Sequence, residues 1–242
     1  MIDVINPDWA APANVHACCT TRAGGTSRAP YDGLNLGQHV GDRSEDVTQN
    51  RRQLAQALAL PSEPCWIEQT HSADAVTLER DAGRRADAAI TREAGRVAVV
   101  MTADCLPILL CDRAGREVAA VHAGWRGLQA GVIQSALAAM QSAPDRLLAW
   151  IGPAISQANF EVGIDVYEAY VDADPSAAAF FDANRPDHWL CDLAGLAESM
   201  LRTAGVDSVT RSAHCTYRDA DRFYSYRRES VTGRMASLIW IS

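Results

Sequence analysis

The sequence predicts an α/β protein (α+β layered) with a central mixed β-sheet core flanked by helices. Three apolar runs at residues 97–101, 106–111 and 118–121 follow one another closely. Continuous apolar, β-branched runs of this length are typical of strands covered on both faces. Amphipathic segments with helical spacing lie before and after these runs. Because no repeat, low-complexity tract or linker divides the chain, we expect residues 1–242 to form a single domain.

The part of the chain before these runs contains predicted strands, loops and one helix. Ser44 precedes apolar side chains at helical spacing, which predicts a helix over residues 45–58 with Ser44 as its N-cap. A Gly- and Asn-rich segment at 31–42 predicts an ordered loop, and residues 81–85 predict a charged turn. Strands are predicted at residues 15–21, 65–69 and 74–79, and residues 86–91 lead into the central strands.

Helical and strand patterns alternate in the part of the chain after the central runs. Residues 128–140 have amphipathic spacing and predict one helix. Asp192 caps a predicted helix that extends to Thr203, and Gly205 closes it. Further helices are predicted at 165–171 and 176–182, and strands at 147–151, 206–211 and 235–241.

The composition excludes several classes of protein. The formal net charge is −8, and no segment concentrates enough basic residues to neutralise phosphates, so we expect no nucleic-acid partner. The N-terminus lacks a basic region followed by an apolar one, and no run approaches the roughly 20 apolar residues of a membrane span, so we expect neither export nor membrane insertion. The seven cysteines are scattered and odd in number, which indicates reduced thiols in a cytoplasmic protein. We expect a monomer or a weak homodimer.

Polar residues that follow the predicted strands form a possible site. His71 and His122 each follow an apolar strand, and Cys105 follows another. Two imidazoles and one thiolate are a donor set of catalytic zinc sites, which leave a fourth position open, whereas structural zinc sites usually show closely paired cysteines. The sequence has no Cys-x-x-Cys pair. The alternative is that these three residues are ordinary buried side chains.

Two other chemical interpretations remain open at this stage. Cys105 can be a nucleophile with His122 as its base, as in a cysteine hydrolase, and Asp104 can then orient the histidine or bind substrate. The same three donors also suit a single copper ion, with Met101 as an axial ligand. A multicopper centre is less compatible with the sequence, which has no His-x-His pair.

Ten short blocks, in order over nearly the whole chain, resemble the signature of the laccase-domain family (YfiH-like proteins). This family was formerly described as multicopper polyphenol oxidases and is now described as purine nucleoside phosphorylases. The blocks lie at residues 21–25 (TRAGG), 34–37 (LNLG), 40–42 (VGD), 50–51 (NR), 69–72 (QTHS), 102–107 (TADCLP), 121–127 (VHAGWRG), 151–153 (IGP), 160–163 (FEVG) and 223–228 (FYSYRR).

The resemblance implies a fold, a metal site and an activity. The implied fold is that of putative cysteine hydrolases, and the implied metal is zinc, with copper as the alternative, held by His71, Cys105 and His122. The implied reactions are phosphorolysis of adenosine, inosine and methylthioadenosine to free base and ribose 1-phosphate, and deamination of adenosine. An amidase that edits peptidoglycan precursors, a copper-dependent polyphenol oxidase and a non-enzymatic metal-binding protein remain alternatives.

A phosphorolytic enzyme also needs groups that hold phosphate and the nucleoside. Guanidinium groups grip oxyanions in bidentate fashion, so Arg22, Arg51 and Arg126 are the candidates for phosphate unless they form structural pairs. Gln69 is a candidate for contact with the base or ribose. Asp104 is a candidate to protonate the leaving base or to orient a metal ligand. Three aromatic residues can stack on the purine or pack the core: Phe223, Tyr224 and Tyr226.

Overall fold

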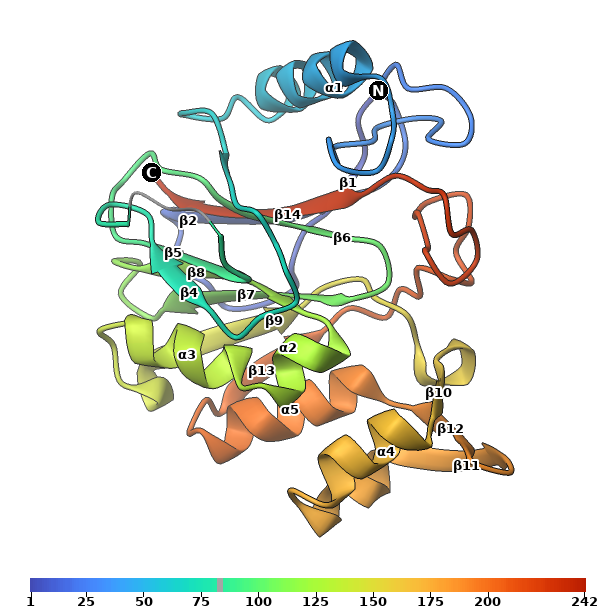
Figure 1. The fold of residues 1–242 in the computed structure, drawn as a ribbon. Helices are drawn as coiled ribbons and strands as arrows, with labels where there is room; N and C mark the ends of the chain where they lie inside the picture. The colour runs from blue at the N-terminus through green and yellow to red at the C-terminus, as the bar shows by residue number, and fades with distance from the viewer. Residues whose placement is uncertain (82–84) are drawn as a thin grey trace.

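The computed structural model describes residues 1–81 and 85–242, and these residues form four layers. Helix α1 (Ser44–Ala57) covers one side of a five-stranded sheet, a six-stranded sheet lies beneath that sheet, and helices cover the far side (Figure 1). The helices of the far side are α2 (Trp125–Gln129), α3 (Val132–Ala139), α4 (Ile164–Val171) and α5 (Leu193–Thr203). The arrangement confirms the predicted α/β class, with two stacked sheets as its core.

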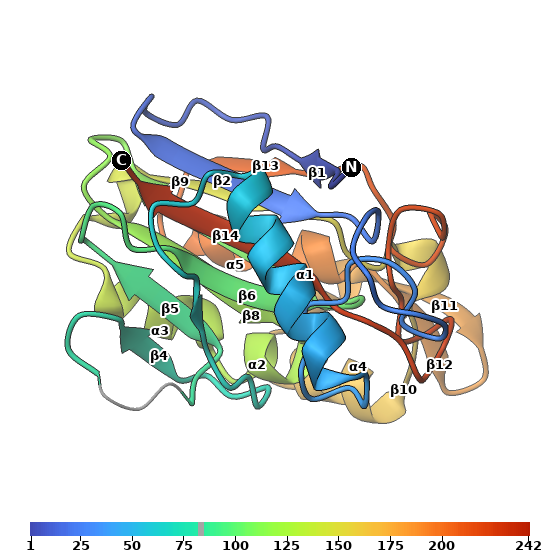
Figure 2. The same cartoon turned by 90° about the horizontal axis from the view of Figure 1, so that it is seen from above.

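The five-stranded sheet joins the two ends of the chain. Its order is β1 (Val4–Ile5), β2 (Val15–Thr20), β14 (Met235–Ile241), β6 (Ala98–Thr102) and β3 (Cys65–Trp66). The C-terminal strand β14 lies between β2 and β6 and is antiparallel to both, as the view from above shows (Figure 2). Strand β3 pairs with β6 in parallel, so the sheet is mixed.

The six-stranded sheet is also mixed, and it carries two of the three predicted central strands. Its order is β13 (Ser208–Arg211), β9 (Leu147–Ile151), β7 (Leu106–Asp112), β8 (Val118–Ala123), β5 (Ala88–Thr91) and β4 (Ala75–Thr77). Successive side chains of a strand point to opposite faces. In β7, Leu109 and Cys111 therefore pack towards the five-stranded sheet, whereas Ile108 and Leu110 pack towards the helices. Burial on both faces explains why β7 has no polar side of its own.

The helices differ from the prediction at three points. The segment predicted as one helix over 128–140 is divided into α2 and α3, because Gly131 adopts a left-handed conformation with φ of 96°. Helix α1 begins at Ser44 with Arg43 as its N-cap, so the predicted capping role of Ser44 is wrong. The predicted helix at 176–182 is a 3₁₀ helix (Pro175–Phe180) that leads into a strand. Asp192 does cap α5, because its carboxylate accepts a hydrogen bond from the backbone N–H of Gly195.

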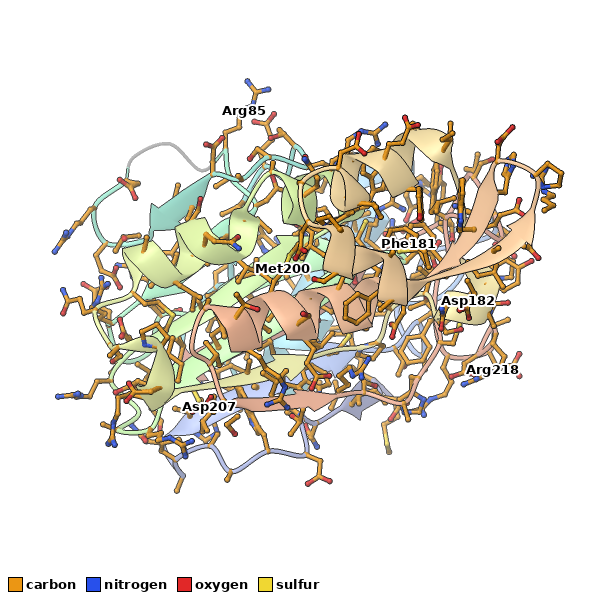
Figure 3. The ribbon with its side chains drawn as sticks, turned by 90° about the horizontal axis from the view of Figure 1, so that it is seen from below. Arg85, Phe181, Asp182, Met200, Asp207 and Arg218 are labelled. Atoms are coloured by element: carbon orange, nitrogen blue, oxygen red, sulfur yellow. The ribbon has the colours of Figure 1, made fainter. Side chains whose placement is uncertain are left out.

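A small three-stranded sheet was not predicted from the sequence. It consists of β10 (Glu161–Gly163), β12 (His188–Cys191) and β11 (Phe181–Arg185), and it packs beside α4. Figure 3 views this side from below, with Phe181 and Asp182 at the start of β11 and Met200 on α5. Two shorter 3₁₀ helices lie at Pro144–Arg146 and Gln157–Asn159.

Two further sequence expectations concern segments rather than elements. Residues 82–84 of the predicted charged turn at 81–85 lie outside the described residues. Among the described residues, no helix combines the length and apolar character needed to cross a membrane.

Candidate metal centre

The structure brings His71, Cys105 and His122 together, although the first and the last are 51 positions apart in the sequence. Strand β7 starts directly after Cys105, and its register with β8 places Pro107 opposite His122. His71 approaches from the loop that follows β3. The three potential ligand atoms all lie within 4.8 Å of one another. The predicted convergence at strand ends is therefore present in the fold.

These three residues line a pocket of about 490 Å³. His122 is buried, Cys105 is half-buried and His71 is exposed, so the cluster opens to the cavity on the His71 side. The volume lies within the range of small-molecule sites. The wall beyond the cluster is partly apolar and includes Trp125 and Leu193.

The donor set fits a tetrahedral metal ion. The Sγ atom of Cys105 and the Nε2 atom of His71 are 3.9 Å apart. A tetrahedral zinc ion with ordinary Zn–S and Zn–N bond lengths would hold these two atoms about 3.5 Å apart. Only a small contraction is thus needed to bind the ion. Among the described residues this is the single cluster of three such donors.

Asp87 supports two of the three donors, and the sequence analysis missed it. Its side chain is completely buried, and Oδ1 lies 2.7 Å from Nδ1 of His122. A carboxylate in this position fixes the tautomer and orientation of a metal-binding imidazole. The pairing assigns the proton of His122 to Nδ1 and leaves Nε2 for the site.

The same carboxylate also shapes the loop that carries His71. Asp87 accepts hydrogen bonds from the backbone N–H groups of Thr70, His71 and Ser72 at 3.1, 3.1 and 2.7 Å. His71 has a φ of 59°, an uncommon conformation for a residue with a side chain. Three bonds to one carboxylate offset the cost of this conformation.

Gly124 allows the three donors to approach each other. A Cβ atom at this position would lie 2.9 Å from Sγ of Cys105 and 3.0 Å from Cδ2 of His71. Both distances are too short for unstrained contacts. The glycine that follows β8 therefore provides the space in which the thiol and imidazole meet.

Two of the donors, Cys105 and His122, have strongly shifted pKa values. Burial raises the pKa of the Cys105 thiol, but the neighbouring charge of His122 and hydrogen bonds with both histidines outweigh it and lower the pKa to about 6. Burial lowers the pKa of His122, but Cys105 and Asp87 outweigh it and raise the pKa to about 9. Each of the two groups therefore favours the charged form of the other: His122 lowers the pKa of Cys105, and Cys105 raises the pKa of His122.

Asp104 lines the pocket, but its carboxylate is occupied by structural contacts. It accepts hydrogen bonds from the hydroxyl groups of Thr216 and Ser225 at 2.7 and 2.9 Å and from the backbone N–H of Arg227 at 2.7 Å. It has no hydrogen bond to the three donors among the described residues. The expected role in orienting His122 is therefore wrong, because Asp87 holds that position. Asp104 instead ties the 216–227 loop to the turn before β7.

We expect Asp104→Asn to lower the free energy of unfolding by about 2 kcal/mol, because hydrogen bonds to a buried carboxylate are lost. Asparagine keeps the side-chain length and also tolerates the φ of 91° at this position. Urea unfolding would measure the loss, with Asp207→Asn as the exposed control. Equal stability of the two variants would contradict the structural role.

The other predicted substrate residues separate into two groups. Gln69 and Arg126 line the pocket, whereas Arg22 and Arg51 do not. Arg22 forms a salt bridge with Asp32 at 3.1 Å. Its predicted role in phosphate binding is therefore wrong, and the structural pairing considered as the alternative applies.

Arg51 and Gln69 satisfy buried backbone groups. Two nitrogens of Arg51 donate to the carbonyl oxygen of Leu36 at 2.8 and 3.0 Å, and its guanidinium lies over the ring of Trp66. The Arg51 guanidinium is thus directed at the protein and not at a phosphate. The amide of Gln69 bonds to both the N–H and the carbonyl of Met101 at 2.7 Å, so it extends the pairing of β3 with β6.

Tyr226 lies on the pocket wall, whereas the other two aromatic candidates pack the core. Phe223 and Tyr224 are completely buried, as the packing alternative expects. Tyr226 is 57% exposed and lines the cavity, where its ring is available to a ligand.

Two imidazoles and a thiol at an open pocket, on stacked mixed sheets, define an α/β protein with a three-donor site suited to one metal ion. The chain belongs to the family described as multi-copper polyphenol oxidoreductase laccase, whose model matches residues 16–242. This finding confirms the resemblance of the ten sequence blocks.

Relatives from several bacteria share the whole length of the chain. Proteins named purine nucleoside phosphorylase YfiH in Escherichia coli K12 and Shigella flexneri are each 48% identical to it over 243 residues, which cover 100% of both chains. A crystal structure from Neisseria meningitidis is 46% identical, with a TM-score of 0.95 and 99% coverage of each chain. The structure of YlmD from Geobacillus stearothermophilus is 30% identical, with a TM-score of 0.88 and the same coverage.

Proposed function

We propose that this single-domain protein is a zinc-dependent purine nucleoside phosphorylase that acts on adenosine, inosine and methylthioadenosine and also deaminates adenosine. The observation that carries the proposal is the meeting of His71, Cys105 and His122 at an open pocket. The names of the relatives support an enzyme of the phosphorylase class. We assign the three residues as ligands of one ion, which supplies a Lewis acid beside the pocket when bound.

The remaining residues bind and orient the reactants. In phosphorolysis, an oxygen of hydrogen phosphate bonds to C1′ of the ribose as the bond from C1′ to N9 of the purine breaks. The proton of hydrogen phosphate ends on the base, so the products are ribose 1-phosphate and free purine. Asp87 keeps His122 oriented, Arg126 supplies positive charge, and Trp125 and Tyr226 give apolar surface to the purine.

An assay of the zinc-loaded protein with adenosine, with and without phosphate, tests the function. We expect adenine to form only when phosphate is present, and inosine to form from the deamination reaction. Prior removal of the metal with a chelator should abolish adenine formation, and addition of zinc should restore it. Full phosphorolysis by the metal-free protein would contradict the proposal.

A second function, a cysteine hydrolase that cleaves an amide, is favoured by one observation. Cys105, His122 and Asp87 are arranged as a thiol, a base and an orienting carboxylate. Iodoacetamide labelling distinguishes the two functions, because a bound metal protects a ligand thiolate while a nucleophilic thiolate in an active enzyme reacts. Amidase activity that persists without metal and is lost on labelling of Cys105 would favour the hydrolase.

A further inference from the structure

The pocket wall carries three arginines that have no carboxylate partner among the described residues. Arg126, Arg227 and Arg234 line the cavity, and His39 lies among them. Among residues 1–81 and 85–242, none of these three arginines forms a salt bridge. The lining contains one carboxylate, Asp104, and three hydrogen bonds already occupy it. In a chain with a net charge of −8, this local excess of cations indicates a site for an anion.

Arg234 is the most constrained of these cations. Its Nη1 donates to the carbonyl oxygens of Thr232 and Gly233 at 3.1 and 3.0 Å. The side chain is half-buried, and burial lowers the pKa of Arg234. A guanidinium with one nitrogen fixed and no carboxylate partner keeps Nε and Nη2 for a ligand.

Asn35 fixes the two segments that carry Arg234 and His39. This completely buried side chain accepts hydrogen bonds at Oδ1 from the backbone N–H groups of Arg234 at 2.9 Å and Gly37 at 3.0 Å. Oδ1 of Asn35 thereby connects the 35–39 loop to the residue directly before β14. His39 follows Gly37 by two residues and reaches the pocket. Burial and the charges of Arg234 and Arg51 lower the pKa of His39.

The aliphatic part of the Arg234 side chain packs directly against Gly37. A Cβ atom at Gly37 would lie 2.8 Å from Cγ and 3.2 Å from Cβ of Arg234. An alanine at this position must therefore displace the arginine side chain. The loop thus provides the space in which Arg234 adopts its present direction.

We propose that Arg234, together with His39 and Arg126, forms an oxyanion subsite in the pocket, with Asn35 and Gly37 as the residues that position Arg234. The subsite takes a phosphate group, and its source in the proposed phosphorolysis is inorganic phosphate. This assignment rests on the proposed function for its role in turnover. It keeps Arg126 of the three arginines that the sequence suggested and replaces Arg22 and Arg51.

The first test compares Michaelis constants of zinc-loaded variants. We expect Arg234→Gln to raise the KM for phosphate by about ten-fold or more, because a charge-assisted bidentate contact is lost, while the KM for adenosine changes less than about two-fold. Gly37→Ala should shift the phosphate KM in the same direction by a smaller factor. Arg52→Gln, on the exposed surface of α1, is the control and should match the wild type. An unchanged phosphate KM in Arg234→Gln would overturn the assignment.

The second test measures binding without turnover. Calorimetric titration of the wild type and of Arg234→Gln with inorganic phosphate, and separately with adenosine 5′-monophosphate, distinguishes a free phosphate from one carried by a nucleotide. Arg234-dependent binding of either ligand supports the subsite, even when the protein shows no phosphorolysis and the proposed function fails. Equal affinity of the wild type and Arg234→Gln for both ligands would overturn it.

Discussion

Replacement of Cys105 or His122 by alanine is expected to reduce the proposed phosphorolysis by at least about a thousand-fold and to prevent most of the zinc binding that we propose. Each change leaves two protein donors, and two donors hold zinc poorly in comparison with three. His122 is buried and Cys105 is half-buried, but the ligand atoms of both lie within 4.8 Å of each other and of that of His71. Adenine release with phosphate and zinc content by elemental analysis are the two measurements. His71→Ala should behave in the same way.

The control for this prediction is His16→Ala. His16 is exposed and stacks on Trp240, outside the pocket residues, so its loss should leave both zinc content and activity unchanged. Circular dichroism of each variant should match the wild type if the fold is kept. A Cys105→Ala protein that retains zinc and turns over adenosine at the normal rate would show that the cluster is not the catalytic centre.

The three donors were candidates because each stands at an abrupt change in local sequence, whereas their role as metal ligands was implied by the family resemblance. His71, Cys105 and His122 interrupt apolar or β-branched segments, and strand ends commonly carry functional groups. Asp87 could not be found in this way. Its partners, Thr70 to Ser72 and His122, are 15 or more residues away, and a single Asp before an apolar strand carries no local sign of them.

For the arginines, the sequence suggested site residues that the structure places outside the pocket. Arg22 and Arg51 stand beside glycine-rich or apolar positions, which suggested a polar cleft. The structure uses them to hold loops, because buried carbonyl groups such as that of Leu36 must find donors. Arg234 carried no signal in its own segment. Its position in the pocket depends on Asn35, about 200 residues earlier in the chain.

The fold was predictable where burial alone determines the pattern. Strands β6, β7 and β8 and helix α5 follow from apolar runs and a capping aspartate. The small sheet could not be predicted, because β11 exposes most of its residues and its pairing with β12 supplies the conformation. Gly131 illustrates a third case. A single glycine is tolerated in many helices, so only its left-handed φ shows that the helix divides there.

Asp87→Asn is expected to weaken zinc binding by about 10–100-fold, the usual effect of removing the partner of a metal-binding histidine. In the native protein, both carboxylate oxygens of Asp87 accept hydrogen bonds from His122 and from the backbone of residues 70–72. In asparagine one of these oxygens is replaced by an NH₂ group, which cannot accept hydrogen bonds, so part of this set is lost. His122 therefore loses its fixed tautomer and His71 its loop conformation. Competition with a chromophoric chelator would measure the affinity, and ¹⁵N NMR of His122 would report the proton on Nδ1.

The free energy of unfolding of Asp87→Asn should depend on pH differently from that of the wild type. Burial raises the pKa of Asp87, but hydrogen bonds from His122 and the Ser72 backbone and the charge of His122 outweigh it and lower the pKa to about 2. This value is below that of an unfolded aspartate, so the ionised carboxylate stabilises the metal-free fold by about 2 kcal/mol above pH 4, and the contribution disappears as the pH falls towards 2. Asp87→Asn should lack this contribution, whereas Asp74→Asn, an exposed neighbour, should retain it. Urea unfolding at pH 7 and pH 3 measures the difference, and a deficit for Asp87→Asn that is the same at both pH values would contradict the assigned role of the charge.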